Sequence, residues 1–259
     1  MKLATNTTGR SARGRAAWAV AVWAGLAAFR GRAARAVRTA GAACALGLAG
    51  FGLLGGGVAA ASGVTPPPSV AAQLATAGGG KAGAASVDHA VFAGGCFWCT
   101  EADFEKLPGV LEAESGYTAG QTPNPTYEQV SAGRTGHTEA VRVWYDPSRI
   151  TYAQLVAHFW RTIDPTVKDR QFCDVGSQYR SGIYWKSPAE RQAAEASRDA
   201  LQRSGRFPVI HTELAPAGVF YVAEAYHQDY YRKNELRYRY YRHGCGRDAR
   251  LQQLWGDKK

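Results

Sequence analysis

The first 87 residues of this 259-residue chain contain no aspartate or glutamate, and Asp88 is the first acidic residue. They hold nine of the chain's 31 Lys and Arg residues, so 22 basic residues remain against all 21 acidic ones from Asp88 onward. The excess positive charge therefore belongs to the N-terminal segment, and it gives no reason to expect that the rest binds nucleic acid. Tyr and Arg alternate over residues 232–255 and could stack on bases, but we expect this segment to wrap around the domain instead.

An acid-free, Arg-rich start is typical of a targeting sequence. An uncharged run over residues 39–68 follows the last of these arginines, and Ala59-Ala60-Ala61 within it offers a small-residue cleavage site. We therefore predict that residues 1–61 are an export segment, in the simplest case a signal peptide, and that the protein is periplasmic or extracellular. An organelle transit peptide and a membrane anchor are the alternatives. Residues 62–87 are rich in Pro, Gly and Ala, which predicts a linker.

Cysteine is scarce, with five residues in the chain, and there is no internal repeat. Cys44 falls in the export segment, which leaves Cys96, Cys99, Cys173 and Cys245. A C-x-x-C pair close to a strand–helix junction favours redox chemistry over a structural disulfide framework. Residues 88–256 are expected to form one compact domain of about 170 residues, long enough to bury a proper core, and residues 257–259 are a short tail.

The pattern of hydrophobic residues in this domain mixes strands and helices without strict alternation. It predicts an α+β fold: a single-domain, two-layer sandwich with a mixed, partly antiparallel sheet flanked by helices. The strands expected from period-two alternation or short apolar runs are residues 90–93, 110–117, 137–145, 178–185 and 209–214. The helices expected from helical spacing and capping residues begin near residue 97 and cover residues 126–130, 151–163 and 187–204.

The stretch Gly94–Cys99, with the sequence GGCFWC, lies between a short buried strand and a helix. Cys96 is therefore expected at a helix N-terminus, where free backbone N–H groups and the helix dipole favour an anion. That position predicts a lowered pKa and a partly ionised thiol near neutral pH. Cys99 follows one helical turn later, which brings the two sulfurs close enough to bridge. A zinc half-site or two buried cysteines are the alternatives.

Glu139 shares a strand face with Val141 and Val143. A carboxyl beside two valines should be partly desolvated, which raises its pKa and keeps it a proton donor nearer neutral pH. The alternative is a glutamate on an edge strand that points into water.

Several motifs, in order and correctly spaced, resemble those of the peptide methionine sulfoxide reductase A family over residues 88–256. They are GCFW at 95–98, GYT at 116–118, PNPTY at 123–127, TGHTEAV at 135–141, YDP at 145–147, DP at 164–165, GSQYRS at 176–181 and AEAYHQ at 223–228. The resemblance implies thiol-dependent reduction of the S epimer of methionine sulfoxide, free or in proteins, and hence repair of oxidised proteins. It implies a thioredoxin-like reductant. Nothing in the sequence requires an organic or metal cofactor, and we expect a monomer.

The resemblance also assigns roles to individual residues. It makes Cys96 the nucleophile, Phe97 and Trp98 the pocket for the substrate methyl group, Glu139 the acid, Tyr127 and Tyr179 the hydrogen-bond donors to the sulfoxide oxygen, and Asp174 a substrate-binding carboxylate. These roles agree with the chemistry, because a sulfoxide is a poor electrophile until its oxygen is protonated. Attack leaves a sulfenic acid on the cysteine, which a second thiol must trap before it is oxidised further.

This chain differs from many members of the family at Cys99. Those members carry Gly at this position and resolve the sulfenic acid with cysteines near the C-terminus. We favour Cys99 as the resolving cysteine. Cys245 is the alternative, either as resolver or as the residue that receives the disulfide and passes it to a reductant. Cys173 is expected only to pack.

Two other classes of protein remain as rivals. A thioredoxin-like disulfide exchanger would use the C-x-x-C pair, but it would not need Glu139 or the two tyrosines. A zinc module would use all four cysteines, although Cys173 and Cys245 do not form the second C-x-x-C that structural zinc sites usually show. A zinc deaminase signature starts similarly at His137-x-Glu139, but here the C-x-x-C precedes it.

Overall fold

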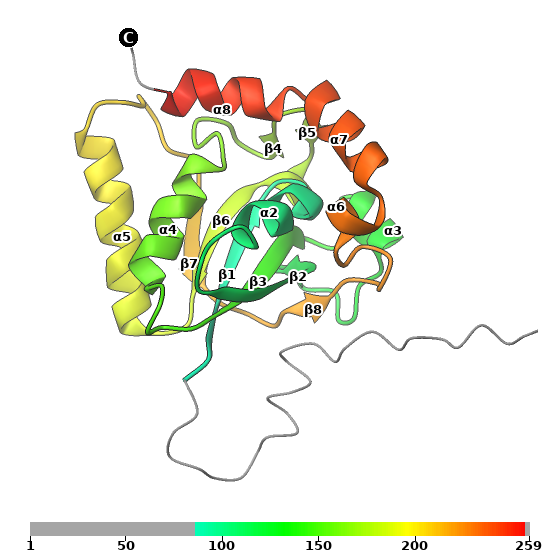
Figure 1. The fold of residues 1–259 in the computed structure, drawn as a ribbon, viewed down its shortest axis with the longest axis horizontal. Coiled ribbons are helices and arrows are strands. Elements are labelled where there is room, and N and C mark those ends of the chain that lie inside the picture. Colours follow the sequence, from blue (N-terminus) through cyan, green and yellow to red (C-terminus); the bar gives the residue numbers. More distant parts are fainter. Residues whose placement is uncertain (1–85, 257–259) are drawn as a thin grey trace, which may run out of the picture. The chain divides into compact units, whose positions relative to one another are not determined.

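The computed structural model describes residues 86–256 (Figure 1). The export segment predicted over residues 1–61 lies outside the described residues, as do almost all of the predicted linker and the tail at 257–259. Within the described range, no helix combines the length and the apolar character that a membrane crossing requires.

A six-stranded sheet is at the centre of the domain, in the order β7-β6-β1-β3-β2-β8. Its strands are β1 (Asp88–Gly94), β2 (Val110–Thr118), β3 (Thr138–Tyr145), β6 (Ser181–Trp185), β7 (Glu213–Pro216) and β8 (Tyr221–Val222). All neighbours pair antiparallel except β6 and β7, which are parallel. The predicted mixed, partly antiparallel sheet is thus confirmed. A small hairpin of β4 (Arg170–Gln171) and β5 (Asp174–Val175) stands apart from it.

Seven helices lie in the described residues, with side-chain caps at Thr126, Thr151 and Ser187. They are α2 (Phe97–Phe104), α3 (Tyr127–Ser131), α4 (Tyr152–Arg161), α5 (Pro188–Arg203), α6 (Tyr230–Lys233), α7 (Glu235–Gly244) and α8 (Arg247–Trp255), with a 3-10 turn η1 (Ser177–Tyr179). Thr126 and Thr151 each accept a hydrogen bond from the backbone N–H three residues on, and the Gln side chain at that position bonds back to the cap. These reciprocal bonds satisfy N–H groups that the helix itself leaves free.

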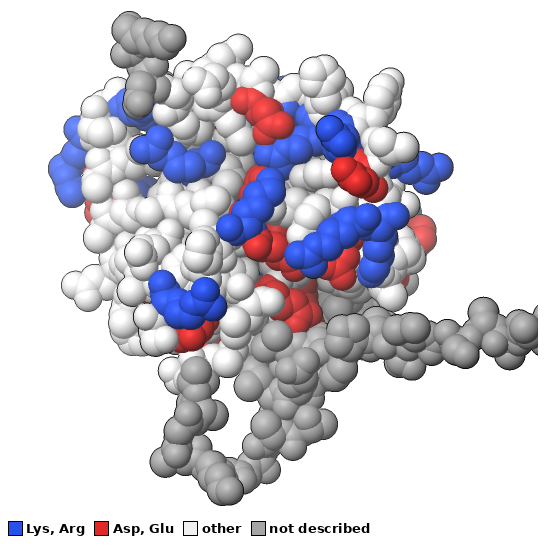
Figure 2. Space-filling view, viewed as in Figure 1, with Lys and Arg blue, Asp and Glu red and all other residues white. Residues whose placement is uncertain are grey.

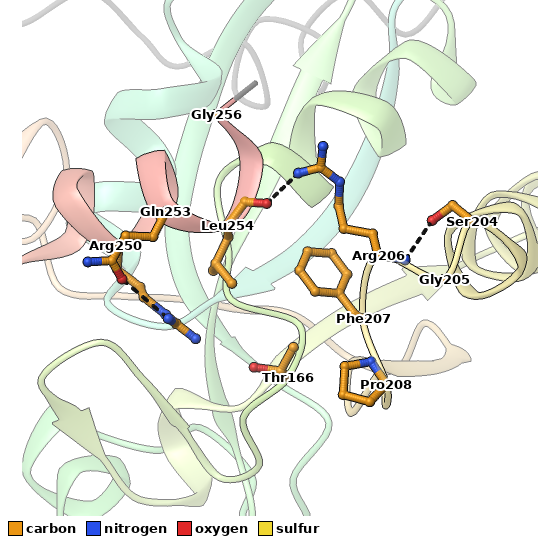
Figure 3. A pocket seen from close by; sticks show the side chains of 10 residues that line it. All are labelled: Thr166, Ser204, Gly205, Arg206, Phe207, Pro208, Arg250, Gln253, Leu254 and Gly256. Atoms are coloured by element: carbon orange, nitrogen blue, oxygen red, sulfur yellow. Dashed lines mark hydrogen bonds between the residues drawn. The ribbon is translucent and has the colours of Figure 1, made fainter. Parts of the chain in front are cut away.

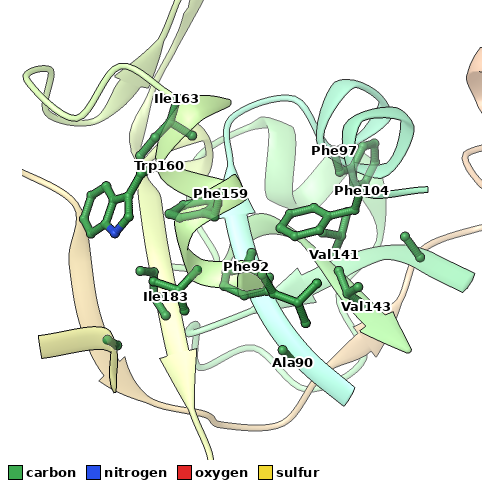
Figure 4. Packing of buried hydrophobic residues seen from close by; sticks show 14 of the residues in the cluster. Ala90, Phe92, Phe97, Phe104, Val141, Val143, Phe159, Trp160, Ile163 and Ile183 are labelled. Carbon is green, nitrogen blue, oxygen red and sulfur yellow. The ribbon is translucent and has the colours of Figure 1, made fainter. Parts of the chain in front are cut away.

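The main core lies between one face of the sheet and the helices α2 and α4 (Figure 4). Phe92 of β1 is fully buried there and stacks on Phe104 and Phe159, with ring centroids 4.8 and 5.2 Å apart. Its neighbours Val91 and Ala93 point to the opposite face, because side chains alternate along a strand, and pack there in a smaller cluster. Helices on one side of the sheet give the predicted two-layer arrangement.

Two predicted strands begin later than expected. The strand predicted over 209–214 pairs only from Glu213 and continues to Pro216; just before it, the N–H of His211 donates to Pro165 instead of to a strand. The strand predicted from Gln178 starts at Ser181, because residues Ser177–Tyr179 form the 3-10 turn. Apolar alternation does not reveal where a neighbouring strand begins to supply hydrogen bonds.

The C-terminal segment wraps around the domain, as predicted, and closes over α2. Tyr238 of α7 packs against Cys99 and Ala102. The guanidinium of Arg247, at the start of α8, is buried and donates to the carbonyl groups of Gly94 and Thr162, at 3.2 and 2.8 Å. Figure 2 shows Lys and Arg side chains interleaved with Asp and Glu over this part of the surface. The interleaving agrees with the near-balance of charge in the sequence.

Candidate active site

A small pocket of about 70 Å³ gathers side chains from five separate parts of the chain. It is lined by Cys96, Phe97, Trp98, Tyr127, Glu139, Asp174, Tyr179 and Tyr241. The first seven are the residues to which the sequence assigned the nucleophile, the acid and substrate contacts. Tyr241 was missed, and the only signal for it was its place four residues before Cys245 in the tyrosine-rich C-terminal segment.

The turn into α2 places Cys96 in this pocket. Gly95 has a φ of +83° there, and an added Cβ would approach Cβ of Gln171 to 2.5 Å, so both the backbone conformation and the packing require glycine. Cys96 is the N-cap of α2, and its carbonyl accepts the N–H groups of Cys99 and Thr100 at 3.1 and 3.3 Å. The first turn of the helix thus stacks Cys99 beneath Cys96.

The predicted ionisation of Cys96 is wrong. Only 5% of the residue is exposed, and burial raises the pKa of its thiol well above the usual value, with a further rise from the hydrogen bond to Cys99. The pKa of Cys99 is instead lowered to about 7, first by the hydrogen bond from Cys96 and then by the positive charges of Arg247 and Arg242. The stabilisation of an anion at the helix N-terminus is smaller than the cost of desolvating the Cys96 thiolate. Of the two thiols, it is therefore Cys99 that ionises more readily.

Glu139 is buried near the start of β3, an interior strand of the sheet, with 2% of its surface exposed. Its strand β3 pairs with β1 on one side and β2 on the other, which excludes the edge-strand alternative. Burial raises the pKa of the carboxyl to about 8. A hydrogen bond from the Phe97 N–H lowers the pKa, and the charge of Asp174 makes a smaller contribution that raises it. A protonated carboxyl at neutral pH, predicted from its two valine neighbours, is confirmed.

Two tyrosine hydroxyls and a second carboxylate complete the polar side of the pocket. Burial raises the pKa of Tyr127 to about 12 and also raises that of Tyr179, so both hydroxyls remain donors at neutral pH. The hydroxyl of Tyr241 donates to Oδ2 of Asp174 at 2.6 Å. Burial also raises the pKa of the Asp174 carboxyl, although the bond from Tyr241 opposes the rise.

The apolar side of the pocket is an aromatic wall held by the C-terminal segment. The indole of Trp98 stacks on Tyr230, with centroids 3.8 Å apart and planes 7° from parallel. Its Nε1 donates to Nδ1 of His227 at 3.0 Å, which fixes the ring in its plane. Phe97 packs against the same histidine, at 4.9 Å between centroids.

Cys173 and Cys245 are joined in a disulfide, with their Cα atoms 5.0 Å apart, while Cys96 and Cys99 are free thiols. The expectation that Cys173 only packs is therefore wrong, because the bond ties the β4–β5 hairpin to the end of α7. Sequence alone could not reveal the pairing, since 72 residues separate the two cysteines. A four-cysteine zinc module does not fit this structure, in which two of the four sulfurs are bonded to each other.

A group of carboxylates near α2 could in principle hold a cation: Glu101, Glu105 and Asp229. Their oxygens already have partners in the protein. Oε2 of Glu101 accepts from the Ser115 hydroxyl at 2.9 Å, and Oε2 of Glu105 accepts from Tyr231 at 2.6 Å. These hydrogen bonds explain why the carboxylates lie close together, so no metal ion is needed to hold them.

A larger cavity of about 590 Å³ lies between the end of α5 and the end of α8 (Figure 3). Arg206 and Arg250 line it, together with Phe207 and Leu254. None of the described residues that line it is a cysteine, a histidine or an acid. The hydroxyls of Thr166 and Ser204 therefore have no acid or base beside them among the lining residues to activate them, and the small pocket at Cys96 is the candidate active site.

Comparison with known proteins agrees with this assignment. The family model described as peptide methionine sulfoxide reductase matches residues 88–259. The chain is 50% identical over 173 residues to peptide methionine sulfoxide reductase MsrA 2 of Caulobacter vibrioides, covering 67% of this chain and 88% of that protein. It is 49% identical over 170 residues to peptide methionine sulfoxide reductase MsrA of Bacillus licheniformis, covering 65% and 94%.

Two solved structures are similar to this fold. Methionine sulfoxide reductase A of Corynebacterium diphtheriae has a TM-score of 0.53 and 38% identity, over 60% of this chain and 78% of that one. Reduced Mxr1 from Saccharomyces cerevisiae has a TM-score of 0.54 and 34% identity, over 60% and 90%.

Proposed function

This chain belongs to the peptide methionine sulfoxide reductase A family, and we propose that it reduces methionine sulfoxide in the small pocket through a sulfenic acid on Cys96. It is a peptide-methionine (S)-S-oxide reductase, an oxidoreductase that uses thiols. The roles proposed for its individual residues are those that the resemblance implies, and their common position in the pocket supports them.

The size of the pocket limits what part of the substrate enters. Its 70 Å³ is far below the roughly 300–1,000 Å³ of pockets that enclose drug-sized molecules. It therefore takes only the methyl sulfoxide end of a side chain and leaves the rest of the substrate outside. That favours both free and protein-bound methionine sulfoxide as substrates, and hence a role in protein repair.

The methyl group packs against Phe97 and Trp98, and the oxygen faces the polar side. There Glu139 gives its proton to the sulfoxide oxygen while Tyr127 and Tyr179 donate hydrogen bonds to it. Asp174 helps to hold the substrate. The Cys96 sulfur attacks the sulfoxide sulfur as its thiol proton leaves. The oxygen, which has received the Glu139 proton and the thiol proton, leaves the substrate sulfur as water. A second water attacks Sγ of Cys96, the bond between the two sulfurs breaks, and the proton released returns to Glu139. The products are methionine and a sulfenic acid on Cys96.

Cys99 is placed to resolve this intermediate. It is buried directly beneath Cys96, and the pKa of its thiol, about 7, makes a large fraction of it thiolate at neutral pH. Its sulfur displaces the sulfenic hydroxyl as water and forms a Cys96–Cys99 disulfide. Cys245, the alternative resolver, is bonded to Cys173 in this structure.

A thioredoxin-like protein is proposed as the reductant, because each turnover leaves a disulfide that two electrons must reopen. We also propose that the enzyme acts as a monomer and that residues 1–61 export it to the periplasm or the cell exterior, with an organelle or a membrane-anchored location as alternatives. The acid-free, Arg-rich composition of that segment supports export.

The observation that carries the proposal is the buried, protonated Glu139 in one pocket with the Cys96 thiol. The test is the kcat/KM of Glu139→Gln for S-methionine sulfoxide with dithiothreitol as reductant. General acid catalysis contributes about 10²–10⁴-fold, so a loss in that range is expected. The matched control is Glu195→Gln on α5, whose carboxylate pairs with Arg191 at the surface. An unchanged kcat/KM in Glu139→Gln would remove the acid from the mechanism.

A further inference from the structure

Two sulfurs and one carboxylate lie together where the β4–β5 hairpin meets the end of α7. They belong to Cys173, Asp174 and Cys245, and their ligand atoms all lie within 4.8 Å of one another. Cys173 is exposed and the other two residues are half-buried, so solvent reaches the group. In the structure the two sulfurs are joined in a disulfide. A dithiol reductant that becomes a disulfide itself supplies the two electrons and two protons that turn them into free thiols.

The spacing within this group is close to that of zinc ligands. Zinc binds thiolate sulfur at about 2.3 Å and carboxylate oxygen at about 2.0–2.2 Å in a tetrahedral arrangement, which places a sulfur and an oxygen on the same ion about 3.6 Å apart. Here Oδ1 of Asp174 lies 3.7 Å from Sγ of Cys173, and Oδ2 lies 3.9 Å from Sγ of Cys245. When the disulfide is reduced the two sulfurs move apart, and a zinc ion then fits between them and the carboxylate.

The ligand types favour zinc over the other common divalent ions. Magnesium and calcium prefer oxygen ligands, whereas thiolates are ligands of zinc. On binding, the ion replaces the two thiol protons, which pass to the solvent. Two thiolates, one carboxylate and Zn²⁺ leave one net negative charge. The buried guanidinium of Arg247 balances that charge from nearby, since it lies 4.5 Å from the ring of Phe172, the residue before Cys173.

Hydrogen bonding already orients the carboxylate for this role. Oδ2 of Asp174 accepts the hydroxyl of Tyr241 at 2.6 Å, which fixes the plane of the carboxylate and keeps Oδ1 towards Cys173. Partners of this kind orient metal ligands, and their loss typically lowers metal affinity about 10–100-fold. On the other side of the group, Gly244 and Gly246 flank Cys245, and neither has an atom within 4 Å of an added Cβ. The backbone there can adjust as the sulfurs separate.

The group supplies three ligands and no more. Among residues 86–256, no further cysteine, histidine or acid belongs to it, so water takes the remaining tetrahedral position. Structural zinc sites almost always have four protein ligands, whereas sites with three keep an open position. The group therefore fits a reversibly bound ion rather than one that holds the fold together.

We propose that the reduced protein binds one zinc ion through Cys173, Cys245 and Asp174, and that this ion inhibits the reduction of methionine sulfoxide. Asp174 also lines the pocket at Cys96, so a carboxylate that ligates zinc is withdrawn from the substrate. The disulfide form does not bind the ion, because its two sulfurs are bonded to each other. The zinc site goes beyond the proposed function and does not depend on it; only the inhibition rests on it.

The first test compares two redox states of one protein. The full chain, carrying Cys44→Ser so that this cysteine cannot bind metal, is reduced with a phosphine, freed of reductant without air and titrated with zinc chloride by calorimetry. One zinc ion per chain is expected. The same protein with its Cys173–Cys245 disulfide intact and Cys96 and Cys99 reduced should bind none at these concentrations. No binding to the reduced protein, or equal binding to both states, would overturn the site.

Variants distinguish this group from the buried thiols. Tyr241→Phe should weaken zinc binding about 10–100-fold, and removal of a ligand in Cys245→Ser should weaken it further. Cys99→Ser is the matched control and should bind zinc as the parent does. Circular dichroism shows whether each variant is folded; if Cys245→Ser is not, Tyr241→Phe still tests the site with both thiols in place. Unchanged affinity in Tyr241→Phe, or lost binding in Cys99→Ser, would contradict the assignment.

Inhibition is measured on the first turnover of the reduced protein, without reductant. The rate of methionine formation from S-methionine sulfoxide should fall as zinc is added, and the zinc concentration that halves it should equal the dissociation constant from calorimetry. Zinc at that concentration should leave the turnover of Cys245→Ser unaffected. Binding without inhibition, or an equal response of Cys245→Ser, would overturn the inhibitory role. No methionine even without zinc would overturn the proposed function instead, while the calorimetry still decides the site.

Discussion

The backbone N–H of Phe97 donates a hydrogen bond to Oε2 of Glu139 at 3.0 Å. This bond connects the first residue of α2 to the second residue of β3 and holds the acid beside the cysteine that precedes Phe97. The bond thereby fixes the position of α2 relative to the sheet, so that the nucleophile Cys96 and the acid Glu139 face the same pocket.

The pH dependence of the chemical step should follow Glu139. Because burial raises the pKa of its carboxyl to about 8, the acid is protonated below that pH and loses its proton above it. We predict that the single-turnover rate at saturating substrate falls as the pH rises through about 8. Stopped-flow measurements on wild type and Glu139→Gln check this, since the variant should be slow and lack the alkaline fall. An identical fall in both would assign it to another group.

Stability should depend on pH through Glu101, a buried residue of α2 whose carboxyl faces Ser115 of β2. Burial raises the pKa of this carboxyl from 4.5 to about 8, against hydrogen bonds from the Asp229 N–H and the Ser115 hydroxyl. A raised pKa in the folded state stabilises the protein fully below pH 4.5, and this contribution is lost as the pH rises towards 8.

The free energy of unfolding should therefore decrease over that range, with at most about 1.4 kcal/mol per pH unit from this one group. Glu101→Gln keeps the shape of the side chain and should flatten the decrease. The raised pKa of Glu139 also makes the free energy of unfolding decrease with pH, so part of the decrease should remain in Glu101→Gln. Urea unfolding at several pH values measures the effect, and parallel curves for wild type and Glu101→Gln would refute the role of Glu101.

The two buried thiols should titrate as a pair. The hydrogen bond from Cys96 is the largest cause of the lowered pKa of Cys99. Cys96→Ala should therefore raise the pKa of Cys99 above its value of about 7, as followed by ultraviolet absorbance of the thiolate with the Cys173–Cys245 disulfide intact. Cys99→Ala serves as the control and should lose the transition near pH 7 altogether. An unshifted pKa in Cys96→Ala would mean that the arginines alone stabilise the thiolate.

The aromatic wall should act on substrate binding more than on chemistry. Tyr230 stacks on Trp98, and such a pair contributes about 0.5–1.5 kcal/mol beyond area burial. Tyr230→Ala should therefore raise KM about two- to tenfold with a smaller change in kcat. Tyr230→Phe keeps the ring and is the matched control. If both variants behave alike, the phenol hydroxyl rather than the stack is responsible.

Local patterns predicted much of the fold and, within the pocket, Cys96 and Glu139. The capping residues Thr126 and Thr151 and the alternation around Glu139 predicted elements that the structure contains, because short-range sequence determines them. The roles of Tyr127, Tyr179 and Asp174 came from resemblance and not from pattern, since as isolated tyrosines and an isolated aspartate they carry no such signal.

The errors concern effects that act over long distances in the sequence. The Cys173–Cys245 bond and the position of Tyr241 depend on how the C-terminal segment folds back over the domain. The ionisation of Cys96 was predicted from the helix end alone, whereas the desolvation that outweighs it comes from the whole set of elements packed around the thiol.

The central claim, that Cys96 reduces the S epimer of methionine sulfoxide, is tested most directly by a single turnover with excess enzyme and no reductant. S- and R-methionine sulfoxide are supplied separately to wild type, Cys96→Ser and Cys99→Ser. The account predicts methionine from the S epimer only, none in Cys96→Ser, and a sulfenic acid that persists in Cys99→Ser. Methionine from neither epimer, or an undiminished yield in Cys96→Ser, would contradict it.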